Sequence, residues 1–164
     1  MKHSQSLMLI AIATFSALSA VGQSTATTRV TSLPPLGLGT TETARVYLTN
    51  IATASTAGTV ASCDGSVSFL NAAGATIGVA TTFKIATQQT TAVSLPFSGA
   101  GLTGSHGVIR TLISVTRPAS TTATPTPPCS LLVAEETFET VSGATHLYFT
   151  DQIAVSGFGG GNGH

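Results

Sequence analysis

Three glutamates near the end of the chain, Glu135, Glu136 and Glu139, form its densest group of acids. Two carboxyl groups about 5 to 9.5 Å apart can hydrolyse a glycosidic bond, and several carboxylate oxygens together can bind calcium. Successive residues of a strand point to opposite faces, so Glu135 and Glu136 would converge only if a bulge turned one of them. No DxDxDG calcium loop occurs. The sequence therefore favours acids that are solvated or paired across a hairpin, with calcium binding and catalysis as alternatives.

The other residues that could do chemistry lack partners at a suitable spacing. Past the first 22 residues the histidines are His106, His146 and His164, and no two of them have the spacing of a metal site. No GxSxG motif is present, and a Ser/His/Asp triad assembled only in the folded chain stays an alternative. The glycine-rich segment 156–164 lacks the strand and helix of a phosphate-binding loop, which predicts a flexible tail. We therefore predict a protein that is not an enzyme, with no catalytic residue, metal ion or cofactor.

Cys63 and Cys129 are the two cysteines of the chain. In an exported protein, two cysteines most simply form one disulfide. Reactive or metal-binding thiols, the alternative, would need a CxxC or Cys/His spacing that is absent here. We predict a disulfide between Cys63 and Cys129, which closes a loop long enough to stabilise the fold by about 4 kcal/mol.

The first 22 residues have the features of a secretory signal peptide. Lys2 precedes the apolar run LMLIAIATFSALSAV, which is too short to favour a membrane span. Ala20 and Gly22 are the small residues of a cleavage site before Gln23, and no later segment is apolar for long enough to cross a bilayer. We therefore predict a signal peptide at 1–22 and a mature protein that is secreted or periplasmic. An uncleaved signal anchor is the alternative.

The composition argues against several classes of partner. Charged residues make up 7% of the chain, whereas about 25% is usual. Without Lys2, five of the six Lys and Arg residues remain against six Asp and Glu residues, so no basic surface for nucleic acid or anionic lipid is expected.

Threonine and valine are frequent, and both favour strands. The composition therefore predicts an all-β domain.

Apolar residues alternate with polar ones in several short segments. In ETARVYLTN, for example, Ala44, Val46 and Leu48 lie on one face, while Arg45 and Tyr47 lie on the other. This period of two is typical of a strand with one buried side. It also predicts that Arg45 and Tyr47 face solvent.

Proline and glycine segments separate these strands, among them the predicted turn at 34–40 and the predicted loop at 117–128. Many short strands divided by turns are typical of a single antiparallel immunoglobulin-like β-sandwich, which we place at residues 23–155. The eight or nine expected strands lie near 27–33, 42–51, 63–71, 75–80, 82–88, 91–97, 107–117, 128–140 and 144–151.

The apolar residues of the strands expected at 128–140 and 144–151 lie on a single buried face only if the pairing is interrupted once. Val133 points inward, but Phe138 and Phe149 reach the same face only if the chain slips by one residue near Glu135 and Glu136. We therefore predict a β-bulge there.

A two-residue turn is expected at Ser142 and Gly143. Such a turn would place an apolar pair inside and an acid opposite a histidine outside. The predicted pairs are Thr140 with Thr145, Glu139 with His146, and Phe138 with Leu147.

The order of these segments resembles a loose group of small secreted bacterial β-sandwich proteins of unassigned function. The similar segments are GLGTTETARVYLTN, CDGSVSFLNAAGATIG, TTAVSLPF, GVIRTLISV and CSLLVAEETFETVSGAT. They cover about residues 36–151, and Glu139 stands where the pattern of the group has an aspartate. The resemblance implies export, a sandwich and a disulfide, and it carries over no active site.

These expectations favour a structural or interaction module outside the cell. Lys84 is the one lysine after the signal, so the sheet edges lack a common protection against pairing. Self-association through edges is one alternative, with segment 25–33 or the glycine tail as the exchanged or docking element; a monomer kept soluble by its Thr and Ser surface is the other. The alternative function is binding of carbohydrate or another cell-surface protein through sandwich loops and the two tyrosines, Tyr47 and Tyr148. No nucleic acid or membrane span is expected.

Overall fold

The computed structural model describes residues 26–53, 62–117 and 129–155, and the predicted signal peptide at 1–22 and tail at 156–164 lie outside these ranges. Within them, no helix is long and apolar enough to cross a membrane. The elements are β1 (Thr27–Ser32), β2 (Leu36–Gly39), β3 (Glu42–Asn50), β4 (Cys63–Asn71), β5 (Thr76–Ile85), β6 (Thr90–Pro96), the single 3-10 turn η1 (Phe97–Gly99), β7 (His106–Arg117), β8 (Cys129–Glu139) and β9 (Thr145–Val155).

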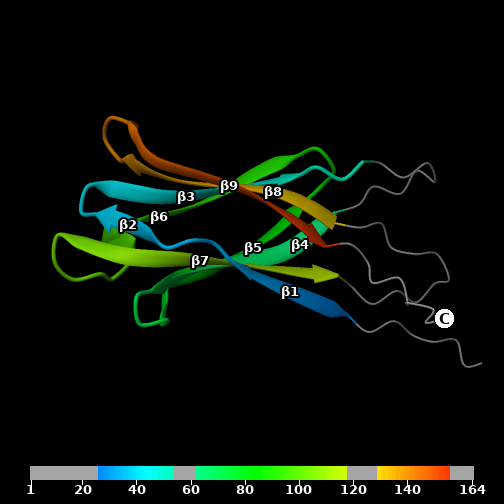
Figure 1. Ribbon diagram of the computed structural model, residues 1–164, viewed down its shortest axis with the longest axis horizontal. Coiled ribbons are helices and arrows are strands. Elements are labelled where there is room, and N and C mark those ends of the chain that lie inside the picture. Colours follow the sequence, from blue (N-terminus) through cyan, green and yellow to red (C-terminus); the bar gives the residue numbers. More distant parts are fainter. Residues whose placement is uncertain (1–25, 54–61, 118–128, 156–164) are drawn as a thin grey trace, which may run out of the picture.

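The strands form two antiparallel sheets, which confirms the prediction of an all-β sandwich (Figure 1). In the first sheet the order is β1-β7-β4-β5, and β2 also pairs with β7. In the second sheet the order is β6-β3-β8-β9. The chain crosses repeatedly between the sheets, so strands that are neighbours in sequence often lie in different layers.

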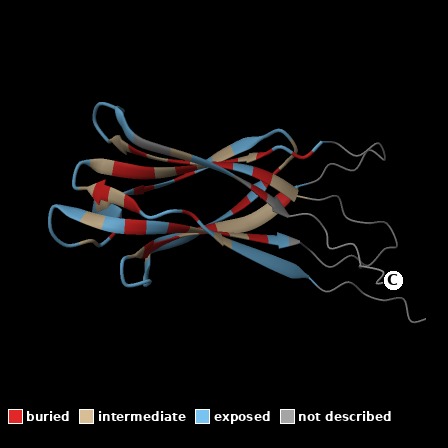
Figure 2. Cartoon of the chain, in the orientation of Figure 1, coloured by how far each residue is buried: buried red, intermediate tan, exposed pale blue. Residues whose placement is uncertain are grey.

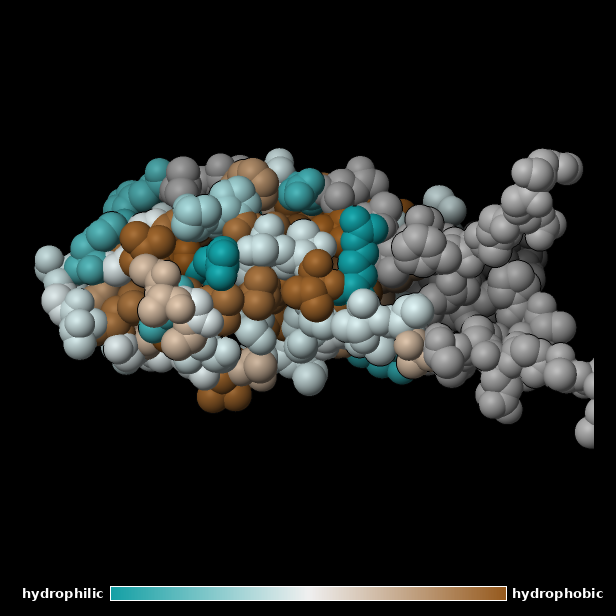
Figure 3. Space-filling view, turned by 60° about the horizontal axis from the view of Figure 1, so that its bottom comes forward, coloured by the Kyte–Doolittle hydropathy of each residue, from teal (hydrophilic) through white to brown (hydrophobic). Residues whose placement is uncertain are grey.

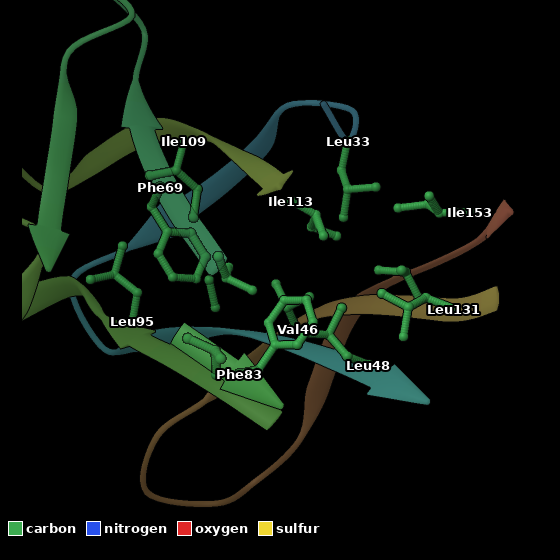
Figure 4. Close-up of a cluster of buried hydrophobic side chains, with 14 of the residues drawn as sticks. Leu33, Val46, Leu48, Phe69, Phe83, Leu95, Ile109, Ile113, Leu131 and Ile153 are labelled. Carbon is green, nitrogen blue, oxygen red and sulfur yellow. The ribbon is translucent and has the colours of Figure 1, made fainter. Parts of the chain in front are cut away.

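The core lies between the two sheets, where buried residues alternate with less buried ones along strands such as β3 and β8 (Figure 2). Ala44, Val46 and Leu48 of β3 are all fully buried, as their alternation predicted. Phe69 and Ile113 from the first sheet belong to the same apolar cluster (Figure 4). Burial of this apolar surface is the main favourable contribution to folding.

The predicted disulfide is confirmed. Cys63 begins β4 in the first sheet and Cys129 begins β8 in the second, and their Cα atoms are 5.3 Å apart. Cys63 is fully buried. The bond therefore joins the two sheets at one end of the sandwich, and no described cysteine is free.

The prediction of a turn at 34–40 is wrong for Leu36–Gly39, which form β2. Leu36 and Leu38 are both buried, so the segment has the alternation of a strand despite its glycines. Gly37 lies against the ring of His106, because a Cβ atom there would be 2.8 Å from His106 Cε1. The glycine that suggested a turn instead lets two strands approach closely.

The two strands predicted at 75–80 and 82–88 are one strand, β5. Val67 pairs with Thr81 but Phe69 pairs with Ile77, so β5 has two extra residues opposite β4. Gly78, with φ of 64°, lies in this bulge. The break that the sequence suggested is therefore an irregularity within a continuous strand.

The β-bulge predicted near Glu135 and Glu136 lies further along the hairpin, between Thr137 and Phe138, and its extra residue is on β9 and not on β8. Along β8 the buried side chains continue without a slip from Leu131 and Val133 to Glu135 and Thr137. Glu135 is fully buried, so an acid takes the inward position that was expected for an apolar residue. The Thr111 hydroxyl of the opposite sheet donates a hydrogen bond to this buried carboxyl group.

The predicted two-residue turn at Ser142 and Gly143 is longer than expected. The N–H of Glu139 donates to the carbonyl of Ala144 at 2.9 Å, and the N–H of Gly143 donates to the carbonyl of Glu139 at 2.8 Å. The register shifts between Thr137 and Phe138. The observed pairs are Thr137 with Leu147 and Phe138 with Thr145, in place of Thr140 with Thr145, Glu139 with His146 and Phe138 with Leu147.

Candidate functional site

The fold separates the three glutamates that first suggested chemistry. Glu135 lies inside the core, Glu136 lies on the outer side of β8, and Glu139 ends the strand, where Thr41 Oγ1 donates to its Oε2 at 2.8 Å. They therefore form no carboxylate pair for glycoside hydrolysis and no shared calcium site. Across the part of the chain that the structure describes, no group of three or more His, Cys, Asp or Glu residues could hold a metal ion.

The outer face of the second sheet instead carries a compact polar and aromatic cluster, which we call the outer cluster. The central strands β3 and β8 lie side by side, and Arg45 pairs in register with Glu136. The neighbouring strand β6 adds a hydroxyl beside Arg45. The members of the outer cluster are Arg45, Tyr47, Ser94, Glu136 and Phe138.

Arg45 is the centre of the outer cluster. Its guanidinium carbon lies 4.3 Å from the ring centroid of Phe138 and 5.9 Å from that of Tyr47. Nη1 donates to the Tyr47 hydroxyl at 3.2 Å, and Nε donates to Ser94 Oγ at 3.1 Å. Nη1 is also 3.9 Å from Glu136 Oε1. Cation–π contacts and hydrogen bonds therefore hold the guanidinium in one orientation.

Glu136 connects the outer cluster to the edge strand β9. Its Oε1 accepts from the Tyr47 hydroxyl at 2.8 Å, and its Oε2 accepts from Thr145 Oγ1 at 3.1 Å. The Glu136 side chain is 12% exposed, whereas the Arg45 side chain is 35% exposed. The acid is thus largely covered, while about a third of the Arg45 side chain remains exposed to solvent.

The two tyrosines predicted as a binding surface belong to this sheet. Tyr47 is half-buried, and its hydroxyl is bonded within the outer cluster, so it is less free than the sequence suggested. Tyr148 pairs in register with Glu136, which places its backbone beside the outer cluster, and its side chain lies outside the described part. Sequence alternation put Arg45 and Tyr47 together, but Glu136 and Phe138 could be added only once β3 was known to pair with β8.

A second polar cluster lies at the end of the sheets. Glu42 accepts from the Gly39 N–H at 2.6 Å, and its Oε1 contacts His146 Nδ1. The hydrogen bond with His146, followed by that from Gly39, lowers the pKa of Glu42. The predicted partner of His146 was Glu139, and this prediction is wrong because the longer turn carries His146 toward β3.

Glu135 forms a third feature, within the core. Thr111 Oγ1 of β7 donates to its Oε1 from the opposite sheet, and Oε2 has no hydrogen-bond partner. Burial raises the pKa of Glu135 to about 7, against a smaller opposing effect of the Thr111 hydrogen bond. The carboxyl group is therefore held in its neutral form over the acidic range.

The outer side of the first sheet offers a contrast to the outer cluster. Figure 3 shows this side of the molecule, where pale and apolar residues outnumber strongly hydrophilic ones. Lys84 Nζ and Asp64 Oδ1 are 4.0 Å apart there, and the Lys84 side chain is 76% exposed. Such an exposed pair is weakly held by comparison with Arg45.

No family model, no curated protein and no solved structure matches the chain. The resemblance to small secreted bacterial β-sandwich proteins stays a prediction.

Proposed function

We propose that this protein is exported and acts as a non-enzymatic interaction module that binds another surface protein through the outer cluster. The observation that carries the proposal is the position of Arg45, held between Phe138 and Tyr47 on central strands and partly open to solvent. Arginine and tyrosine are enriched among the residues that contribute most to protein interfaces. Their fixed orientation here reduces the entropy that a partner would have to remove on binding.

The proposal extends to export and to an immunoglobulin-like type of sandwich. The N-terminal pattern of residues 1–22 and the Cys63–Cys129 disulfide support an oxidising compartment. The repeated crossings between sheets, with a disulfide that joins β4 to β8, support the immunoglobulin-like type.

A polysaccharide partner is the second candidate, and Tyr47 is the observation that favours it. Aromatic side chains on a sheet face can stack on sugar rings, and Tyr148 lies one strand beyond Glu136 in register. The half-buried ring and bonded hydroxyl of Tyr47 leave less area for stacking than an exposed platform would. For this reason the protein partner is our primary proposal.

Binding measurements on matched variants test the proposed function. The purified protein is presented to a glycan array and to envelope proteins separated from the producing cells. Arg45→Ala should weaken the principal interaction about tenfold or more, as expected for a central interface arginine. Lys84→Ala removes a cation from the other sheet and should leave binding unchanged. Equal binding by both variants would refute the proposal, and a signal confined to glycans would favour the polysaccharide partner.

A further inference from the structure

Strand β1 is attached to the sandwich in a different way from the other strands. It pairs with β7 over six residues, from Thr27 opposite Arg117 to Ser32 opposite Leu112. None of its side chains is buried, and Val30 is 59% exposed. Figure 2 shows the exposed strand along the margin of the molecule, beyond β7 in Figure 1. The backbone ladder is therefore its main attachment.

Two prolines separate β1 from the rest of the chain. Leu33, directly after β1, is buried, and its N–H donates to the carbonyl of Thr111 at 2.9 Å. Pro34 and Pro35 follow, both exposed, and then β2 resumes the pairing with β7 at Leu36. Proline has no N–H to donate and a fixed φ, so this step holds the chain extended without ladder bonds. The segment of Pro34 and Pro35 therefore has the properties of a hinge between β1 and β2.

The edge formed by β1 is less protected against pairing than the edges formed by β5 and β6. The opposite edge of the same sheet, β5, has a bulge at Gly78 and carries Lys84. In the second sheet, edge strand β6 ends in Pro96. Bulges, lysines and prolines all oppose pairing with another chain. Residues Thr27–Ser32 contain no bulge, lysine or proline, and Arg29 is their one charged residue.

We infer that β1 is an exchangeable strand, which leaves its own β7 and pairs with β7 of a second copy of this chain. A second copy of the chain is the expected partner because its β7 offers the same edge that β1 already matches over six residue pairs. Exchange re-forms the same ladder between two copies, and only the hinge at Pro34 and Pro35 changes. Leu33 would move with β1 and would fill the same buried site, beside Ile113 and Ile153 (Figure 4), in the second copy.

Disulfide trapping distinguishes exchange from simple contact between edges. Thr28 and Thr116 face each other across β1 and β7, with their hydroxyl oxygens 3.4 Å apart. Full-length Thr28→Cys and Thr116→Cys proteins are mixed, passed through mild denaturant, and oxidised. Exchange predicts a covalent heterodimer whose yield rises with protein concentration.

A control pair shows whether trapping is specific. Thr49 and Thr90 make an equivalent exposed contact at 2.9 Å between β3 and the edge strand β6, but β6 is followed and preceded by other strands of the sandwich and cannot leave alone. A mixture of Thr49→Cys and Thr90→Cys should give no heterodimer. Equal trapping of both pairs, homodimers through Cys at position 28 alone, or no dimer at all would each overturn the inference.

The unmodified full chain provides a second measurement. Light scattering after size exclusion should show dimers that form after denaturant treatment at high concentration and dissociate slowly on dilution. A monomer at every concentration would overturn the inference even if the cysteine variants failed to fold. Binding through the outer cluster does not depend on this result, because the outer cluster lies on the other sheet.

Discussion

The two faces of β8 carry the same pair of residue types in opposite surroundings. Leu131 and Glu135 are fully buried, whereas Leu132 is 41% exposed and Glu136 lies in the outer cluster. In each pair the two residues are of the same type and are adjacent in the chain, so they point to opposite faces of the sheet. The comparison shows that position in the pleat, more than residue type, decides whether a side chain stabilises the core or takes part in the surface.

The largest expected difference between the faces concerns the leucines. Leu131→Ala should lower the free energy of unfolding by about 4 kcal/mol, because it removes buried methyl groups and leaves a cavity. Leu132→Ala should lower it by less than about 1 kcal/mol, because that side chain is partly in water. Denaturant unfolding of both variants measures the difference. Similar losses would show that the two faces are equally packed.

The glutamates should differ in their effect on pH dependence. Below about pH 4.5 Glu135 is neutral in both states, while between there and its folded pKa of about 7 only the unfolded state ionises. The free energy of unfolding of the wild type should therefore fall by about 3 kcal/mol as the pH rises through this window.

Glu135→Gln should remove this loss of stability, and Glu136→Gln should retain it. Denaturant unfolding at intervals from about pH 4.5 to about pH 7.5 compares the three proteins. A wild-type curve without this decline, or a decline that persists in Glu135→Gln, would mean that Glu135 is not held neutral in the core.

The smallest expected effect concerns the outer face alone. Tyr47→Phe removes a hydroxyl that accepts from Arg45 and donates to Glu136 while leaving the ring in place. The free energy of unfolding should fall by about 1 kcal/mol or less. Thermal unfolding measures this change, and a loss as large as that of Leu131→Ala would show that the outer cluster supports the fold.

Several elements of the fold could be predicted from the sequence because they depend on local pattern. The alternation in ETARVYLTN predicted β3 and its buried face, and the two cysteines predicted the disulfide. Segment 34–40 was misjudged because its glycines suit a turn and equally permit the close approach of Gly37 to His106. A local pattern does not distinguish these two uses of glycine.

The sequence by itself determined an all-β chain with a set of short strands and one disulfide, since composition and a period of two are local properties. Only the tertiary structure decided that Glu135 lies buried against Thr111 and that Arg45 meets Phe138 and Glu136. Both outcomes depend on pairings between distant segments: β7 opposite β8 across the core, and β3 beside β8 in one sheet. A buried acid becomes tolerable, and an arginine becomes ordered, only when the fold brings the partner to it.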